Sequence, residues 1–177
     1  MTAPLILTLQ LAAEAQAFFD ALRRAHFPPA RNYLAAHLTL FHHLPGACLA
    51  DVAIRLSALS AAQAPLPLRV AGLQFLGQGV AYAIDSPPLE ALHRQLQQEW
   101  WTELRPQDQQ RCRPHVTVQN KVAPAVARAL HQQLSAGFAP FDTTGTGLQL
   151  WAYRGGPWEL LRTFPFAALQ PGGSGAV

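Results

Sequence analysis

The chain has 177 residues, of which half are hydrophobic and 13% are charged, and its formal net charge is +3 at pH 7. This length suits one domain with a buried core, and the composition excludes an intrinsically disordered chain. No apolar run reaches the roughly 18 residues of a membrane span, and the weak positive charge excludes a protein that grips long nucleic acid. We therefore expect neither a membrane nor a DNA-specific partner.

Residues 1–11 contain no basic leader and no cleavage site, and Cys48 and Cys112 fit no metal or redox spacing. Two distant thiols are typical of a reducing compartment. The expected location is the cytoplasm.

The first half of the chain alternates predicted strands with predicted helices. Apolar–polar alternation predicts strands at residues 5–11, 36–44, 68–76 and 80–84, the last two as a hairpin around Gly77-Gln78-Gly79. Helical periodicity predicts one helix between the first two strands, with the apolar stripe Leu11, Ala15, Phe18, Leu22 and Ala25. It predicts a second helix after Pro45-Gly46, with the stripe Leu49, Val52, Leu56 and Leu59.

The second half repeats this order. Ser86 and Pro87 predict the start of a helix that runs to about Leu104, with the stripe Leu89, Leu92, Leu96 and Trp100. A helix from Pro124 has the stripe Val126, Leu130 and Leu134. Strands are expected at residues 112–121, 142–152 and 157–166.

Each half therefore contains strand, helix, strand, helix, strand, which indicates an internal duplication over about 4–76 and 79–166. We expect one domain over residues 1–169, with two lobes that face each other across a cleft. Residues 170–177 are expected to form a flexible tail, and the expected oligomeric state is a monomer.

The tetrapeptide pattern His-apolar-Thr-apolar occurs twice, as His37-Leu38-Thr39-Leu40 and as His115-Val116-Thr117-Val118. On a strand the two apolar residues of each copy point into the core, while the histidine and the threonine share the opposite face. An imidazole moves protons near neutral pH, and a hydroxyl donates to phosphoryl oxygens. Two such pairs, one on each wall of a cleft, indicate a phosphate site.

This pairing resembles the 2H phosphoesterase superfamily, which is named for two His-x-Ser/Thr-apolar motifs in one chain. The superfamily includes the bacterial RNA 2',3'-cyclic phosphodiesterases, also called 2'-5' RNA ligases. The resemblance implies an α+β fold of two pseudo-symmetric lobes, with mostly antiparallel sheets, helices outside and a central cleft. It implies His37, Thr39, His115 and Thr117 as catalytic residues.

The chemistry expected of such a site is the opening of a 2',3'-cyclic phosphate on an RNA terminus or a small nucleotide. One histidine activates water and the other protonates the departing ribose oxygen, so two histidines meet both demands without a metal or another cofactor. The sequence does not say which histidine is the acid, nor whether the enzyme acts as a hydrolase or as a 2'-5' ligase. Two alternatives stay open: a module that binds RNA ends or nucleotides without chemistry, and a phosphodiesterase for a non-RNA small molecule.

Further substrate-binding residues are predicted by strand parity and by position, and each has an ordinary packing or solvent-exposed alternative. Those on the faces of the motif histidines are Phe41, Arg113, Gln119 and Lys121. Tyr33 lies in the loop before the first motif, and Trp151 ends a late strand. Phe41 is a candidate for stacking on a base.

A metal site is the competing hypothesis for His37, His42 and His43. On a straight strand His42 points away from His37, and His43 lies about 20 Å farther along, too far for a shared ion. We therefore expect no metal.

Overall fold

The computed structural model describes residues 2–167, so the predicted flexible tail at 170–177 lies outside the described residues. Within them, seven strands form one antiparallel sheet in the order β2-β1-β6-β3-β4-β5, with β7 paired to β6. The strands are β1 (Leu5–Leu11), β2 (Leu38–Leu44), β3 (Leu66–Phe75), β4 (Val80–Asp85), β5 (His115–Gln119), β6 (Phe141–Ala152) and β7 (Glu159–Pro165).

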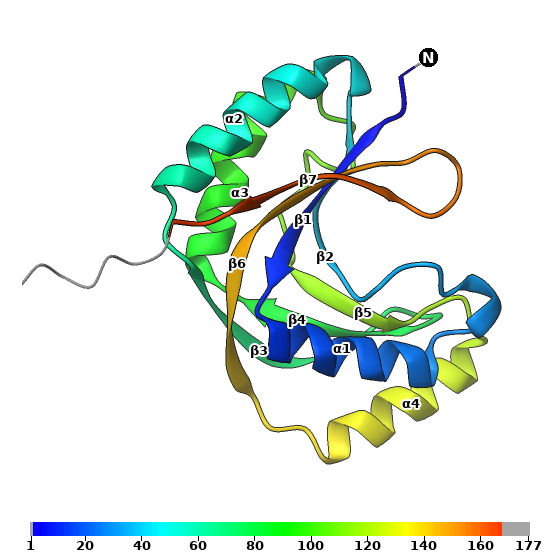
Figure 1. Ribbon diagram of the computed structural model, residues 1–177. Coiled ribbons are helices and arrows are strands. Elements are labelled where there is room, and N and C mark those ends of the chain that lie inside the picture. Colours follow the sequence, from blue (N-terminus) through cyan, green and yellow to red (C-terminus); the bar gives the residue numbers. More distant parts are fainter. Residues whose placement is uncertain (1, 168–177) are drawn as a thin grey trace, which may run out of the picture.

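The helices cover the outside of this sheet. They are α1 (Ala13–His26), α2 (Leu49–Ala62), α3 (Pro87–Glu99) and α4 (Pro124–Ala136), with short 3-10 turns at Pro29–Arg31, Gly46–Cys48 and Trp101–Glu103. Figure 1 shows α2 and α3 together on one side of the molecule and α1 and α4 on the other. None of the helices in the described part of the chain has the length and apolarity needed to cross a bilayer. The predicted α+β architecture is confirmed.

The sheet curls until its two ends meet. β2 and β5 are the first and last strands of the sheet order, yet residues of these two strands contact each other. Figure 1 shows them side by side near the centre of the molecule. Because these are the two motif strands, closure of the sheet brings together segments that are far apart in the sequence.

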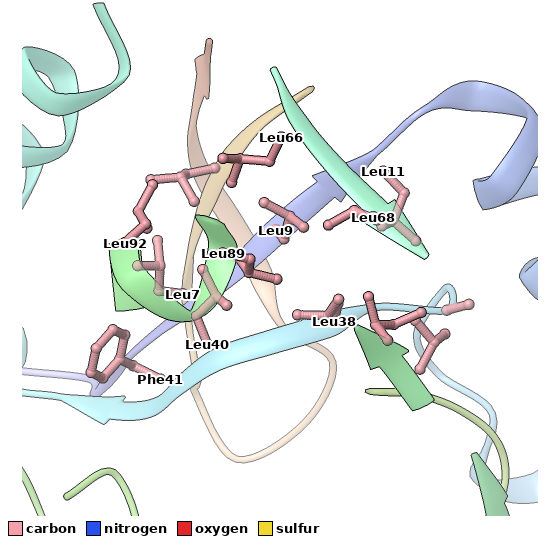
Figure 2. Packing of buried hydrophobic residues seen from close by; sticks show 14 of the residues in the cluster. Leu7, Leu9, Leu11, Leu38, Leu40, Phe41, Leu66, Leu68, Leu89 and Leu92 are labelled. Carbon is pink, nitrogen blue, oxygen red and sulfur yellow. The ribbon is translucent and has the colours of Figure 1, made fainter. Parts of the chain in front are cut away.

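Strands from the two sequence halves are interleaved. β6, from the second half, pairs with both β1 and β3 of the first half, and α1 packs against β5. Neither half therefore has a sheet of its own, and the core is continuous. Figure 2 shows this core where β1, β2, β3 and α3 pack together.

The apolar residues of both motifs belong to that core, as predicted. Leu38 is fully buried and Leu40 is 3% exposed in β2, and Val116 and Val118 are fully buried in β5. Burying an aliphatic side chain of this kind contributes about 1.5–3 kcal/mol, so these residues hold each motif strand in place. The histidines and threonines between them are only half-buried.

Some helix stripes differ from those predicted. In α1 the buried residues are Ala15, Phe19 and Arg23, whereas Phe18 is 41% exposed. The helix is rotated because Phe19 packs into the core while Phe18 lies at its rim, edge-on to Phe141. Ala25 is exposed as well.

The first predicted residue of two other stripes is also exposed. Leu49 is 39% exposed and Val126 is 52% exposed, and both lie in the first turn of their helices. In α4 the buried stripe runs through Ala127 and Leu130 instead. The predicted helix to Leu104 ends at Glu99 and is followed by the 3-10 turn at Trp101–Glu103.

Candidate active site

The two motif histidines are held in the same way. His37 lies immediately before β2, and its Nδ1 is 2.8 Å from the backbone oxygen of Ala35. His115 is the first residue of β5, and its Nδ1 is 2.8 Å from the backbone oxygen of Arg113. In each case the partner is the carbonyl two residues earlier, so a neutral ring carries its proton on Nδ1 and keeps the Nε2 lone pair free.

Two cavities, called compartments below, lie at the motifs. Thr39 and His115, one from each motif, line a cavity of about 430 Å³. His37 lines a second cavity of about 560 Å³, together with Tyr33, Trp151 and Trp158. The first motif strand thus contributes to both compartments, one of which is aromatic.

His37 is electrostatically distinct. The pKa of His37 is lowered to about 4, chiefly by burial and also by the positive charges of Arg23, His115 and His42, against the opposing effect of the hydrogen bond to Ala35. The Trp158 ring contributes to this enclosure, with its centroid 4.6 Å from that of the His37 ring. At neutral pH, His37 is therefore a neutral base with a free Nε2, within electrostatic range of His115.

Arg23 on α1 links the two motifs. Its guanidinium is buried and donates from Nη1 to the backbone oxygen of Thr117, at 3.0 Å. Its Nε donates to Asn32 Oδ1 at 2.9 Å and to the Leu34 oxygen at 3.0 Å, both in the loop that leads to His37. The same group lies 4.0 Å above the ring of Phe27. One side chain of α1 therefore ties the second motif strand to the approach of the first.

Two predicted substrate-binding residues are buried, so those predictions are wrong. Phe41 is fully buried and stacks on His93, with ring centroids 4.5 Å apart, and Figure 2 shows it among the leucines of the core. Gln119 is 4% exposed.

The cause is the same in both strands. The pairing register of β2 with β1 shifts between Thr39 and Phe41, and that of β5 with β4 shifts between Thr117 and Gln119. Such a bulge adds one residue and reverses the alternation after it. The residue that follows each tetrapeptide therefore turns inward.

The remaining predicted residues divide between the cleft and its surroundings. Arg113 is exposed and lines the cavity that contains His115, and Tyr33 and Trp151 line the cavity that contains His37. The Trp151 Nε1 donates to Thr8 Oγ1 at 2.9 Å, which fixes the indole. Lys121 lines neither cavity, because it lies beyond β5 in a left-handed conformation with φ of 63°. Thr117 is half-buried beside His115 in β5, and its backbone oxygen is the acceptor of Arg23.

His42 and His43 are held by a carboxylate. Asp108, which is 4% exposed, accepts from the backbone nitrogens of His42 at 2.9 Å and His43 at 2.8 Å. Its Oδ1 is also 3.1 Å from His42 Nδ1. No group of three or more residues suited to a metal ion occurs among the residues that the structure describes.

Three residues of this site were missed by the sequence analysis: Arg23, Asp108 and Trp158. The signal for Arg23 is its helical spacing with Ala15 and Phe19, which places it on the buried face of the helix. Asp108 and Trp158 lie in loops, where the sequence has no periodic pattern that predicts a contact with a distant strand.

A family model described as the 2'-5' RNA ligase superfamily matches residues 11–157. No curated protein matches the chain significantly.

Solved structures resemble the fold over nearly its whole length. TT0787 of Thermus thermophilus has a TM-score of 0.66 and 16% identity, over 94% of this chain and 100% of its own. E. coli LigT complexed with 3'-AMP has a TM-score of 0.59 and 22% identity, over 94% and 99%. A protein described as a phosphoesterase has a TM-score of 0.61 and 18% identity, over the same shares. LigT has also been crystallised with NADP+ and with ATP.

Proposed function

The chain belongs to the 2'-5' RNA ligase superfamily, within the 2H phosphoesterases, and from this premise we propose that it is a metal-independent phosphodiesterase. Its substrate is a 2',3'-cyclic phosphate on an RNA end or a small nucleotide. The observation that carries the proposal is the matched support of His37 and His115. Both keep Nε2 free while Nδ1 meets the carbonyl two residues earlier.

The roles of the two histidines follow from the low pKa of His37. With a pKa of about 4, His37 is neutral at pH 7, so its Nε2 is ready to accept a proton from the attacking water. His115 then donates the proton that the departing ribose oxygen needs. After one turnover His37 has gained a proton and His115 has lost one, and exchange with solvent restores both.

Thr39 and Thr117 stand two residues after the histidines, on the same strands. Their hydroxyls donate to the non-bridging oxygens, where negative charge grows in the transition state. Arg23 acts as a positioning residue, because it holds the carbonyl of Thr117 and the loop before His37 without lining either cavity.

Two further features support a nucleotide as the substrate class. The compartment that contains His37 is lined by Tyr33, Trp151 and Trp158, whose rings suit a nucleobase or a ribose. Structures of E. coli LigT contain 3'-AMP, NADP+ or ATP. In 2'-5' ligation the 5'-hydroxyl of a second RNA takes the place of water: one histidine accepts its proton, the bond from phosphorus to the 3'-oxygen breaks, and the other histidine protonates that oxygen.

The test is product analysis by chromatography on a panel of 2',3'-cyclic nucleotides and oligonucleotides with cyclic ends, in the presence of a chelator. We expect hydrolysis by the wild type. Removing either proton-transfer group typically lowers the rate by about 100-fold to 10,000-fold. The hydrolysis rates of the His37→Ala and His115→Ala variants are therefore each expected to fall by that factor. The matched control is His131→Ala on α4, which removes a histidine that contacts Phe75 instead.

The proposal is refuted if the wild type turns over no member of the panel, or if both motif variants, folded by circular dichroism, keep wild-type rates. Binding of cyclic nucleotides without any turnover is the result that assigns a non-catalytic binding module instead. Turnover restricted to a non-nucleotide phosphodiester keeps the chemistry and changes the substrate.

A further inference from the structure

The smaller compartment has cationic side chains in its wall. The cavity of about 430 Å³ that contains Thr39 and His115 extends to His42, Arg111 and Arg113. Arg113 is exposed and has no ion pair among the described residues. The side chain of Arg111 is 82% exposed and meets Glu90 only loosely, at 3.3 Å. Two guanidinium groups are therefore available at this wall.

His42 is presented to the same cavity by a buried carboxylate. The imidazole of His42 is 48% exposed, whereas the Asp108 side chain that meets its Nδ1 is 2% exposed. Burial on its own raises the pKa of Asp108, but hydrogen bonds from the His42 ring and from the backbone of His42 and His43 lower it below its usual value. Asp108 is thus an anion that fixes the ring and leaves Nε2 for a ligand.

This pairing suits an anionic ligand. Asp108 orients the ring of His42, and an imidazole N–H on the exposed part of the ring suits a negative group. Among the described residues that line this cavity, Asp108 is the only carboxylate, and it already accepts from three donors. The cavity itself therefore offers positive charge.

We propose that His42, Arg111 and Arg113 form a second anion subsite, which takes a phosphate group of the substrate next to the one that reacts. The inference rests on the proposed function for the position of the reacting phosphate. The aromatic rings line the other compartment, with His37, so a nucleoside is favoured there and a flanking phosphate here. The preferred substrate is then a nucleotide or an RNA end with a second phosphate, in place of a nucleoside cyclic phosphate alone.

The test is calorimetric titration with two probes that differ by one phosphate, adenosine 3'-monophosphate and adenosine 3',5'-bisphosphate, at one ionic strength. We expect the wild type to bind the bisphosphate about tenfold more tightly or better, the effect of one charge-assisted phosphate contact. His42→Gln and Arg113→Gln are each expected to reduce this preference to about threefold or less, with the double variant losing it. The control Arg69→Gln removes an equal charge from an exposed pair with Asp142 and is expected to keep the preference.

Equal binding of the two probes by the wild type overturns the subsite, as does a preference that survives the double variant. Hydrolysis of 2',3'-cyclic AMP, measured in parallel, separates the two proposals. Turnover with no preference for the bisphosphate overturns the subsite alone. A preference lost in the variants without any turnover supports the second anion site and overturns the proposed function. Binding of neither probe overturns the subsite, and the absence of turnover as well overturns both.

Discussion

Replacement of Arg23 by methionine tests how the two motifs are held together. The change removes hydrogen bonds to three acceptors, the oxygens of Thr117 and Leu34 and Oδ1 of Asn32, and leaves these groups without their donor. A hydrogen bond from a charged donor contributes about 1.5–3 kcal/mol. The loss is smaller than the sum of three such bonds, because their contributions are not additive and because methionine avoids the cost of burying a charge. We expect Arg23→Met to lower the free energy of unfolding by about 3–5 kcal/mol, a large share of the 5–15 kcal/mol of a typical domain.

The loss is measured by urea denaturation, beside Arg69→Met as the control. Arg69 makes an exposed ion pair with Asp142, and such a pair contributes about 0–1 kcal/mol. Activity gives a second readout: because Arg23 repels a protonated His37, its removal raises the pKa of His37, and the acid limb of kcat/KM moves to higher pH.

Arg23→Lys keeps the charge but cannot reach acceptors in two segments, so we expect it to lose stability while the acid limb stays in place. A loss for Arg23→Met no greater than that for Arg69→Met, with wild-type kcat, refutes the reasoning.

Three further predictions concern groups beside the motifs. Asp108→Asn is expected to lower the free energy of unfolding at pH 7 by about 2–3 kcal/mol, since the carboxylate accepts from His42 and His43. The pKa of Asp108 in the folded state is lowered, so this stabilisation is lost as the pH falls through that pKa. The urea midpoints of the variant and the wild type should therefore converge in acid, and a constant difference between them would contradict this explanation. Trp158→Ala exposes the His37 ring and is expected to raise its pKa, measured by NMR titration of the imidazole; an unchanged pKa would show that other groups cause the burial. Between pH 6.5 and about 4 the unfolded state binds a proton on His37 that the folded state does not, so wild-type stability should fall with decreasing pH more than that of His37→Gln; parallel urea-midpoint curves would argue against it.

Much of the fold could be predicted because it depends on local periodicity. All seven strands and four α-helices were predicted near their observed positions, since alternation and the 3.6-residue repeat are properties of neighbouring residues. The burial of Leu38, Leu40, Val116 and Val118 followed from the same alternation. The closure of the sheet that brings β2 to β5 is a long-range property: the duplication predicted two lobes that face each other, but not that their strands interleave in one sheet.

The errors in the site arise where local periodicity is interrupted. Phe41 and Gln119 share the parity of the motif histidines in the sequence, but each follows a register shift and is buried. A bulge has no fixed residue signature at such positions, so strand parity is reliable within the tetrapeptide and fails one residue beyond it. The contacts of Arg23 and Asp108 join segments 94 and 66 residues apart, a separation at which a single sequence contains no pairing information.

The repetition of the bulge explains why the two motifs are equivalent. In both strands the register shift comes directly after the apolar residue that follows the threonine, so the motif face ends at the same point in each. In both, the histidine precedes the ladder or begins it, and its Nδ1 meets the carbonyl two residues earlier. Equivalent backbones therefore present equivalent imidazoles, and the difference between the two histidines comes from their surroundings. Burial, with Trp158 against the ring, and the charge of Arg23 act on His37, so the asymmetry that the proposed acid and base require is supplied by loops and by α1 rather than by the motifs.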